Sequence, residues 1–362
     1  MLFKTQFIKC TLCIILYIAI CSVLLVIKRS FYLQQQSNSI RLTKDNQTKQ
    51  KCSVVSRATT RPTNLEIKLL KHDEVNGQSI DLHESATLLR QISNTCAKYN
   101  LKTLLIKRHF LYDSTHKSMY CWIRKVASTS FTKLFSDMKN RRVARNYYRE
   151  VDVLAPKTME ELYRIANDAK TFKLLVVRHP FQRLVSSYRD RLEDNSKHTT
   201  QAWIYTKKIF RLTRPQLFHS NTTTANFQRK VFTAGKRLKI VPTFKEFTLW
   251  LLENSEEDVH WDRYYTHCGV CNMQYNYVLK LDDYTYREIN YIFSKFGLNE
   301  TTIYLPKLEK THGGHTDFDT TCKYLANLTQ NMIFKLYEKY KIDFEMYNYN
   351  LNRYIFCASK KT

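Results

Sequence analysis

Residues 172–193, FKLLVVRHPFQRLVSSYRDRLE, contain the pattern that decides the fold. Residues 172–177 form a short apolar run, which predicts a buried strand of a parallel sheet. Pro180 then suits the first turn of a helix. The apolar residues that follow recur at helical spacing and form one stripe: Phe181, Leu184, Val185, Tyr188 and Leu192. This stretch therefore predicts a strand, a turn and a helix.

A second stretch follows the same plan. Residues 118–124, SMYCWIR, read as a strand, and Phe131, Leu134, Phe135 and Met138 give the next segment a helical stripe. Two strand-turn-helix units in close succession predict an α/β fold with a parallel sheet. Ligands in such folds bind at the carboxyl ends of the strands, where both turns lie.

The first turn, KVASTS at residues 125–130, resembles a phosphate-binding turn that has no glycine. A helix N-terminus offers free amide groups to an anion, so Lys125 and the small residues 127–130 can serve this role. We expect a gentle turn, because glycine is required only where φ is positive or the backbone approaches a ligand closely. Lys125 precedes the turn, whereas the lysine of the nucleotide-triphosphatase loop follows it, which argues against ordinary ATP chemistry.

The second turn has Arg178 at the end of its strand and Ser186 further along its helix. A helical wheel places Ser186 with Arg183 and Asp190, opposite the apolar stripe, where it is free to meet a ligand. The alternative is a solvated helix face with a capping serine.

Together these turns resemble the two cofactor-binding motifs of the Golgi carbohydrate sulfotransferases, a family that includes the chondroitin 4-O enzymes. The family patterns are P-K-V-A-x-T-x-W and R-D-P-F-x-R-L-x-S-x-Y-R-x-K. The resemblance continues in VHWDRYYTHCGVC, residues 259–271, and in LYEKYKIDFEMYNY near the C-terminus. This chain departs from the patterns at Arg124, Ser128, Ser130, Phe131 and His179, and it keeps Lys125, Arg178 and Ser186.

The resemblance implies a P-loop-like sulfotransferase fold, with a central parallel sheet flanked by helices, and 3′-phosphoadenosine 5′-phosphosulfate as donor substrate, without a metal. Lys125 would act on the bridging oxygen, while Arg178 and Ser186 would hold the 3′-phosphate. The residues implied in donor binding are Arg124, Lys125, Val126, Ala127, Ser128, Thr129, Ser130, Arg178, His179, Pro180, Phe181, Gln182, Arg183, Leu184, Val185 and Ser186.

His260 is the candidate general base, because it lies in the matching HWDRYY stretch and a histidine titrates near neutral pH. The neighbouring Trp261 is expected to stack on a sugar ring. His260 can equally serve only to order the loop before Cys268. His179 is a rival base, although its position after Arg178 suggests helix capping, and the carboxylates near Asp262 are further rivals.

Residues 10–27 carry no charge and are long enough to cross a bilayer, which predicts a signal anchor rather than a cleaved signal peptide. We expect a cytoplasmic tail at 1–9, a polar stem at 28–80 and a luminal sulfotransferase domain at 81–362. Four glycosylation sequons favour the secretory lumen: Asn46, Asn221, Asn299 and Asn327. This pattern predicts a single-pass type II protein of the Golgi membrane.

The chain has 58 Lys and Arg residues against 32 Asp and Glu, a formal charge of +26, which favours a polyanionic partner. A luminal domain excludes nucleic acid and favours an acidic glycan such as chondroitin or dermatan, with the 4-hydroxyl of N-acetylgalactosamine as acceptor. Another glycan hydroxyl, a non-catalytic glycan-binding protein and a kinase are the alternatives. The basic run at residues 139–150 fits a solvated helix face or a glycan-binding site equally well. Residues 195–239 show no clear pattern of a helix or a strand.

Seven cysteines follow the apolar segment, and an oxidising lumen allows disulfides among them without fixing their pairing: Cys52, Cys96, Cys121, Cys268, Cys271, Cys322 and Cys357. A zinc site at Cys268 and Cys271 is disfavoured, because no second C-x-x-C follows.

Overall fold

The computed structural model describes residues 82–143, 146–196, 198–218, 224–282, 285–298 and 314–358, all within the unit Gly77–Thr362. The expected tail, apolar segment and stem, residues 1–80, lie outside the described residues. Among the helices of the described ranges, none is long and apolar enough to cross a membrane.

A four-stranded sheet carries the order β1-β2-β3-β4. Its strands are β1 (Phe110–Asp113), β2 (Ser118–Cys121), β3 (Phe172–Val177) and β4 (Tyr277–Lys280). Strands β2, β3 and β4 are parallel, as the two predicted units require. The predicted parallel arrangement holds for these three strands, and β1 adds an antiparallel edge by pairing with β2. Only residues 114–117 join these strands, and a parallel pair needs a crossover of a dozen residues or more.

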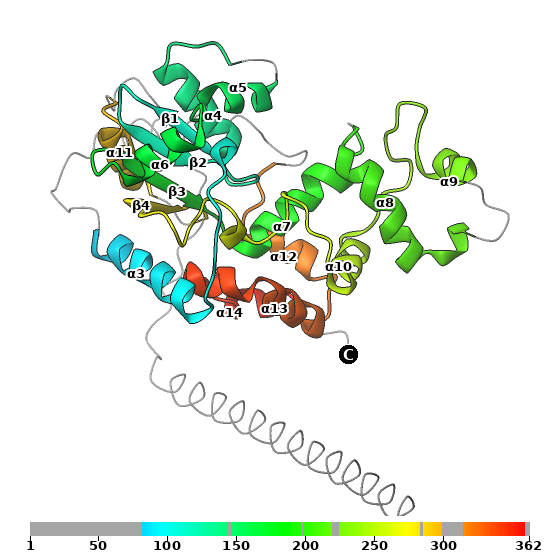
Figure 1. Cartoon of the computed structure of the whole chain (residues 1–362). Helices are drawn as coiled ribbons and strands as arrows, with labels where there is room; N and C mark the ends of the chain where they lie inside the picture. Colours follow the sequence, from blue (N-terminus) through cyan, green and yellow to red (C-terminus); the bar gives the residue numbers. More distant parts are fainter. Residues whose placement is uncertain are drawn as a thin grey trace, which may run out of the picture. The chain divides into compact units, whose positions relative to one another are not determined.

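Helices flank the sheet, as Figure 1 shows. Helices α4 (Ser128–Met138) and α5 (Tyr147–Leu154) pack against β1, while α3 (Leu82–Lys98) contacts β4. Helices α6 (Met159–Asn167) and α11 (Tyr286–Lys295) complete this half of the molecule. The strand residues point into a core that includes Tyr120, whose ring stacks on Phe131 of α4 at 4.4 Å between centroids.

A helical half carries a second core (Figure 1). It contains α7 (Pro180–Tyr188), the π-helical turn η2 (Arg189–Glu193), α8 (Thr200–Thr213), α9 (Thr224–Val231), α10 (Phe244–Glu253), α12 (Phe318–Leu325), α13 (Gln330–Met346) and α14 (Asn352–Ile355). Helices α10 and α13 both bury apolar residues in this core. The stretch 195–239, which the sequence left unassigned, supplies α8 and α9.

Three disulfides join distant segments: Cys96–Cys271, Cys121–Cys268 and Cys322–Cys357. The C-x-x-C pair is therefore divided between two disulfides and holds no zinc. Gly269 between them has a φ of +52°, and a Cβ there would lie 2.3 Å from Leu105 Cδ2, so a side chain here would strain the backbone and displace Leu105. The two disulfides clamp the loop that follows residue 260 onto β2 and α3.

Candidate active site

A cavity of about 1010 Å³ opens at the carboxyl ends of the three parallel strands. The turn after β2, the turn after β3, and Lys280 at the end of β4 with the two residues that follow it all contribute to its lining. The two turns singled out in the sequence thus meet at one site, where the topology of parallel α/β sheets places ligands.

The turn after β2 is not the gentle one expected. Lys125 has a φ of +69° and Ala127 a φ of +59°, so two residues with side chains occupy the left-handed region. Such conformations cost free energy and cluster at functional sites. Ala127 is the N-cap of α4 and offers no side-chain cap to the first amide groups of this helix, whose residues Ser128, Thr129 and Ser130 line the cavity.

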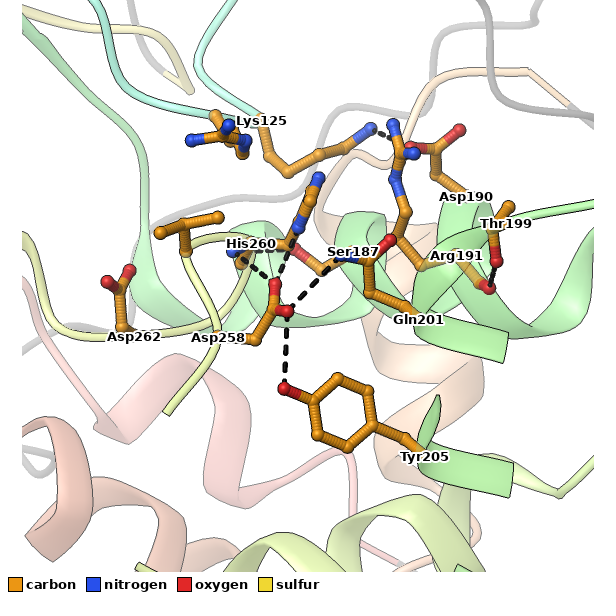
Figure 2. Close-up of polar contacts among 12 residues, drawn as sticks. Lys125, Ser187, Asp190, Arg191, Thr199, Gln201, Tyr205, Asp258, His260 and Asp262 are labelled. Atoms are coloured by element: carbon orange, nitrogen blue, oxygen red, sulfur yellow. Dashed lines mark hydrogen bonds and ion pairs between the residues drawn. The ribbon is translucent and has the colours of Figure 1, made fainter. Parts of the chain in front are cut away.

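Lys125 is held by an acidic residue of η2. Its Nζ lies 3.0 Å from Asp190 Oδ2, and Arg191 Nε lies 2.7 Å from the same oxygen (Figure 2). Lys125 and Arg191 both line the cavity. One carboxylate therefore faces two cations at the position expected to receive an anion.

Arg178, the first residue after β3, contacts the turn after β2. Its guanidinium donates to the carbonyl oxygens of Lys125, at 3.3 Å, and of Thr316. Burial lowers the pKa of Arg178, against the opposing effect of Tyr264 and Asp282. Gln182 and Ser186, one and two turns along α7, also line the cavity, so this helix presents one polar stripe to it.

Six of the predicted donor-binding residues do not line the cavity: Val126, Pro180, Phe181, Arg183, Leu184 and Val185. The helical wheel grouped Arg183 with Ser186, yet the Arg183 guanidinium points elsewhere. It lies 3.0 Å from Asp262 Oδ1 and stacks on Tyr264, with 4.6 Å from its central carbon to the ring centroid. Asp262 is also 2.8 Å from His267 Nε2, so the structure gives this carboxylate a place in a buried network.

His179 caps α7, as its position suggested. Its Nδ1 accepts a hydrogen bond from the Phe181 amide at 3.2 Å, which requires an unprotonated nitrogen. Burial lowers the pKa of His179 to about 3. The ring packs among Phe344, Tyr349 and Tyr354 and lines the cavity with one edge.

His260 lines the same cavity as Lys125, although the two are far apart in the sequence. Its Nδ1 lies 2.6 Å from Asp258 Oδ1, and its Nε2 is buried with no hydrogen-bond partner among the described residues. Burial lowers the pKa of His260, Arg191 and Arg124 lower it further, and the hydrogen bond to Asp258 opposes them. A neutral imidazole with one vacant nitrogen can accept a proton from a bound hydroxyl.

The neighbouring Trp261 does not have the expected role. Its side chain is 1% exposed and packs against Phe247 and Tyr205 in the helical core. Other aromatic residues line the cavity, among them Trp122 and Tyr148, which flank Arg124 at 4.9 and 5.4 Å from ring centroid to guanidinium carbon. Tyr148 falls within the basic run at 139–150, where the sequence analysis considered only charge.

Several other lining residues lie outside the motifs that predicted the site: Lys280, Asp282, the segment around Thr316 and the C-terminal pair Arg353 and Tyr354. Arg191 also lines the cavity and stands at the last position of the second motif, where the family pattern has Lys. The aromatic-rich tail after residue 329 was the available signal. Among the described residues, no group of three or more His, Cys, Asp or Glu side chains is arranged to hold a metal.

An anionic donor requires a cavity whose lining carries more positive than negative charge. Among the described residues, six cations line the cavity, namely Arg124, Lys125, Arg178, Arg191, Lys280 and Arg353, against the carboxylates of Asp282 and Asp317. The buried Arg124 Nε has no hydrogen-bond partner among the described residues. The residues present fit a ligand that carries several negative charges.

Comparison with known proteins agrees with this geometry. The family described as "Sulfotransferase family" matches residues 108–350. "Carbohydrate sulfotransferase 11" of Mus musculus is 26% identical over 288 residues, which cover 73% of this chain and 76% of that protein. "Carbohydrate sulfotransferase 14" of Danio rerio is 23% identical, covering 72% and 70%. No solved structure matches this chain.

Proposed function

The chain belongs to the sulfotransferase family, and from this premise we propose that it transfers a sulfuryl group from 3′-phosphoadenosine 5′-phosphosulfate to a glycan hydroxyl. It is a carbohydrate O-sulfotransferase. The observation that carries the proposal is the meeting of Lys125, Arg178 and His260 in one cation-rich cavity at the strand ends.

Each of the two turns would bind a different end of the donor. The free amide groups at the start of α4 and the Lys125 ammonium would hold the 5′-phosphosulfate end. Arg178 and Ser186 would hold the 3′-phosphate, which distinguishes this donor from ATP. Arg178 suits this role because backbone carbonyl oxygens orient its guanidinium without neutralising its charge.

When bound, the donor supplies a sulfuryl group whose bond to the 5′-phosphate oxygen breaks as the acceptor oxygen bonds to sulfur. His260 Nε2 takes the proton of the acceptor hydroxyl. Lys125 stabilises the negative charge that develops on the departing phosphate oxygen, provided that it leaves Asp190. These residues supply position and charge, as in phosphoryl transfer.

For the acceptor, we propose chondroitin or dermatan, with the 4-hydroxyl of N-acetylgalactosamine as the site of transfer. The motif resemblance to the chondroitin 4-O enzymes supports this choice, as does the formal charge of +26. A different hydroxyl, on a uronic acid or on a glycoprotein glycan, is the alternative.

We also propose that the domain faces the Golgi lumen behind an N-terminal anchor. Three disulfides suit an oxidising compartment. Asn327, the acceptor residue of one sequon, follows the end of α12. Its side chain is exposed, so a glycan can be attached to it.

The test is transfer of radiolabelled sulfate by the purified full-length chain onto chondroitin, dermatan, desulfated heparan and glycoprotein glycans, followed by disaccharide analysis. Calorimetry should show tighter binding of adenosine 3′,5′-bisphosphate than of ATP. Lys125→Ala is the matched inactive control. Bisphosphate binding without transfer to any acceptor would favour a non-catalytic glycan-binding protein, and a preference for ATP would favour a kinase.

A further inference from the structure

We propose that Asp258 is a positioning residue that fixes His260 as the proton acceptor, and that Gln201 and Tyr205 of α8 hold Asp258 in place. This inference rests on the proposed function, because it concerns the same reaction. It assigns a role to α8, in the part of the chain that carries none of the sulfotransferase motifs.

Asp258 receives hydrogen bonds on both carboxylate oxygens (Figure 2). Its Oδ1 accepts from the His260 amide at 3.0 Å and lies 2.6 Å from His260 Nδ1. Its Oδ2 accepts from Gln201 Nε2 at 3.2 Å and from the Tyr205 hydroxyl at 3.3 Å. Burial raises the pKa of Asp258, but the hydrogen bonds from His260 and Gln201 outweigh it, and the pKa is lowered.

The ionised carboxylate determines the tautomer of His260. A carboxylate only accepts hydrogen bonds, so the proton of the neutral ring must reside on Nδ1. The lone pair then resides on Nε2, the nitrogen that is buried without a partner among the described residues. His260 is 4% exposed and lines the cavity together with Lys125. The pair therefore presents a base, rather than a donor, toward the expected acceptor.

Helix α8 connects this base to the turn that holds Lys125. Thr199 caps α8 by accepting from the Ala202 amide at 3.0 Å, and its hydroxyl donates to the carbonyl oxygen of Arg191. Gln201 and Tyr205 are four residues apart and so lie on one face of the helix. The start of α8 is thus fixed to η2, which contains Asp190 and Arg191.

One proton moves from the acceptor to His260 during transfer. The acceptor hydroxyl gives its proton to His260 Nε2 as its oxygen bonds to sulfur, and the Nδ1 proton stays in place. The resulting imidazolium is stabilised by the Asp258 charge, and Asp258 itself does not become protonated, as in the serine protease triad. The imidazolium then releases its Nε2 proton to solvent.

Asp258→Ala and Asp258→Asn in the full-length chain test the inference. We expect kcat to fall about 10- to 100-fold in Asp258→Ala and at least as much in Asp258→Asn, whose NH2 group can donate to Nδ1 and so favour the tautomer protonated on Nε2. Bisphosphate affinity, measured by calorimetry, should change less than about twofold in both. The acidic limb of kcat against pH should move to lower pH, because Arg124 and Arg191 then act on His260 unopposed.

Asp113→Asn is the matched control. Asp113 Oδ1 lies 2.7 Å from His116 Nδ1 and accepts from the His116 amide at 2.8 Å, so this pair repeats the geometry away from the cavity lining. We expect wild-type kcat and an unmoved acidic limb in Asp113→Asn. If the Asp258 variants behave like this control, the inference is wrong.

A double-mutant cycle excludes a merely structural role. In the His260→Ala background, Asp258→Ala should lower kcat less than twofold further, because Asp258 acts through His260. Additive losses would overturn the inference. Independently of activity, ¹⁵N NMR of histidine-labelled protein should show His260 protonated at Nδ1 in the wild type and a mixture of tautomers in Asp258→Ala. Protonation at Nε2 in the wild type would refute the inference even if transfer is confirmed, whereas absence of transfer with the expected tautomer would refute the proposed function.

Discussion

The ion pair between Lys125 and Asp190 should oppose donor binding, so Asp190→Asn is expected to tighten the binding of adenosine 3′,5′-bisphosphate. The pair spans 3.0 Å, and its side chains are 13% and 8% exposed, so water screens it little. Lys125 must exchange this carboxylate for a phosphate oxygen when the donor binds. Removing the carboxylate removes the competing partner.

The size of the effect follows from the geometry. Two unit charges at this separation interact by about 5 to 6 kcal/mol at an effective dielectric constant of about 20, which is a ceiling. Arg191 shares the same oxygen at 2.7 Å, and the variant amide can still accept a hydrogen bond. A hydrogen bond between charged groups contributes about 1.5 to 3 kcal/mol net. The lower end of that range corresponds to a dissociation constant about tenfold lower.

Titration calorimetry with the bisphosphate measures the change directly. Asp152→Asn is the control, because Asp152 pairs with Arg108 at 2.6 Å, does not line the cavity and loses the same charge. An affinity unchanged relative to this control would show that Asp190 does not compete with the donor. Weaker binding in Asp190→Asn would show that the pair positions Lys125 for the donor instead.

Four further outcomes are expected. Arg178→Lys should weaken bisphosphate binding about 10- to 100-fold in calorimetry, because an ammonium cannot reproduce the forked donors; unchanged affinity would contradict the assignment. Ala127→Gly should keep activity and change the free energy of unfolding by less than about 1 kcal/mol, because glycine tolerates the left-handed conformation but loses more backbone entropy on folding. Ala127→Val should lose both activity and stability, because a branched side chain is strained in that conformation. Cys96→Ser should lower the free energy of unfolding by about 2 to 5 kcal/mol in denaturant titrations, and no loss would argue against the disulfide to Cys271. The folded state keeps His179 neutral, with a pKa of about 3, whereas His179 of the unfolded chain binds a proton near pH 6.5. The free energy of unfolding should therefore fall by about 2 kcal/mol between pH 6.5 and 5. His179→Asn, which can still cap the helix, should lack this part of the fall.

The elements that the sequence predicted are those whose pattern is local. The apolar run at 172–177 became β3 with the predicted bounds, and the stripe after Pro180 became the buried face of α7. The stripe from Phe131 to Met138 likewise belongs to α4. Burial of one face imposes a period on the sequence, and that period can be read without a structure.

Other features depend on partners that are distant in the chain. Three features have no local signature: the pairing of β1 with β2, the placement of His260 in the same cavity as Lys125, and the support of Asp258 by α8. The positive φ of Lys125 and Ala127 was also missed, because glycine is the usual signal for that conformation. In this turn the surrounding structure, rather than residue type, imposes the left-handed backbone.

Helix α7 shows why charge in a motif is not enough to identify a donor-binding residue. Arg183 and Arg178 lie five residues apart in the same motif; Arg183 is buried and Arg178 is half-buried. Arg183 is paired with the Asp262 carboxylate, so its charge is neutralised within the core. Among the described residues Arg178 has no carboxylate within ion-pair distance, and its guanidinium is oriented by backbone carbonyl oxygens at the cavity. Because carbonyl dipoles orient a cation without cancelling its charge, Arg178 keeps a net attraction for an anion that Arg183 has lost, and the partner of each arginine decides its role.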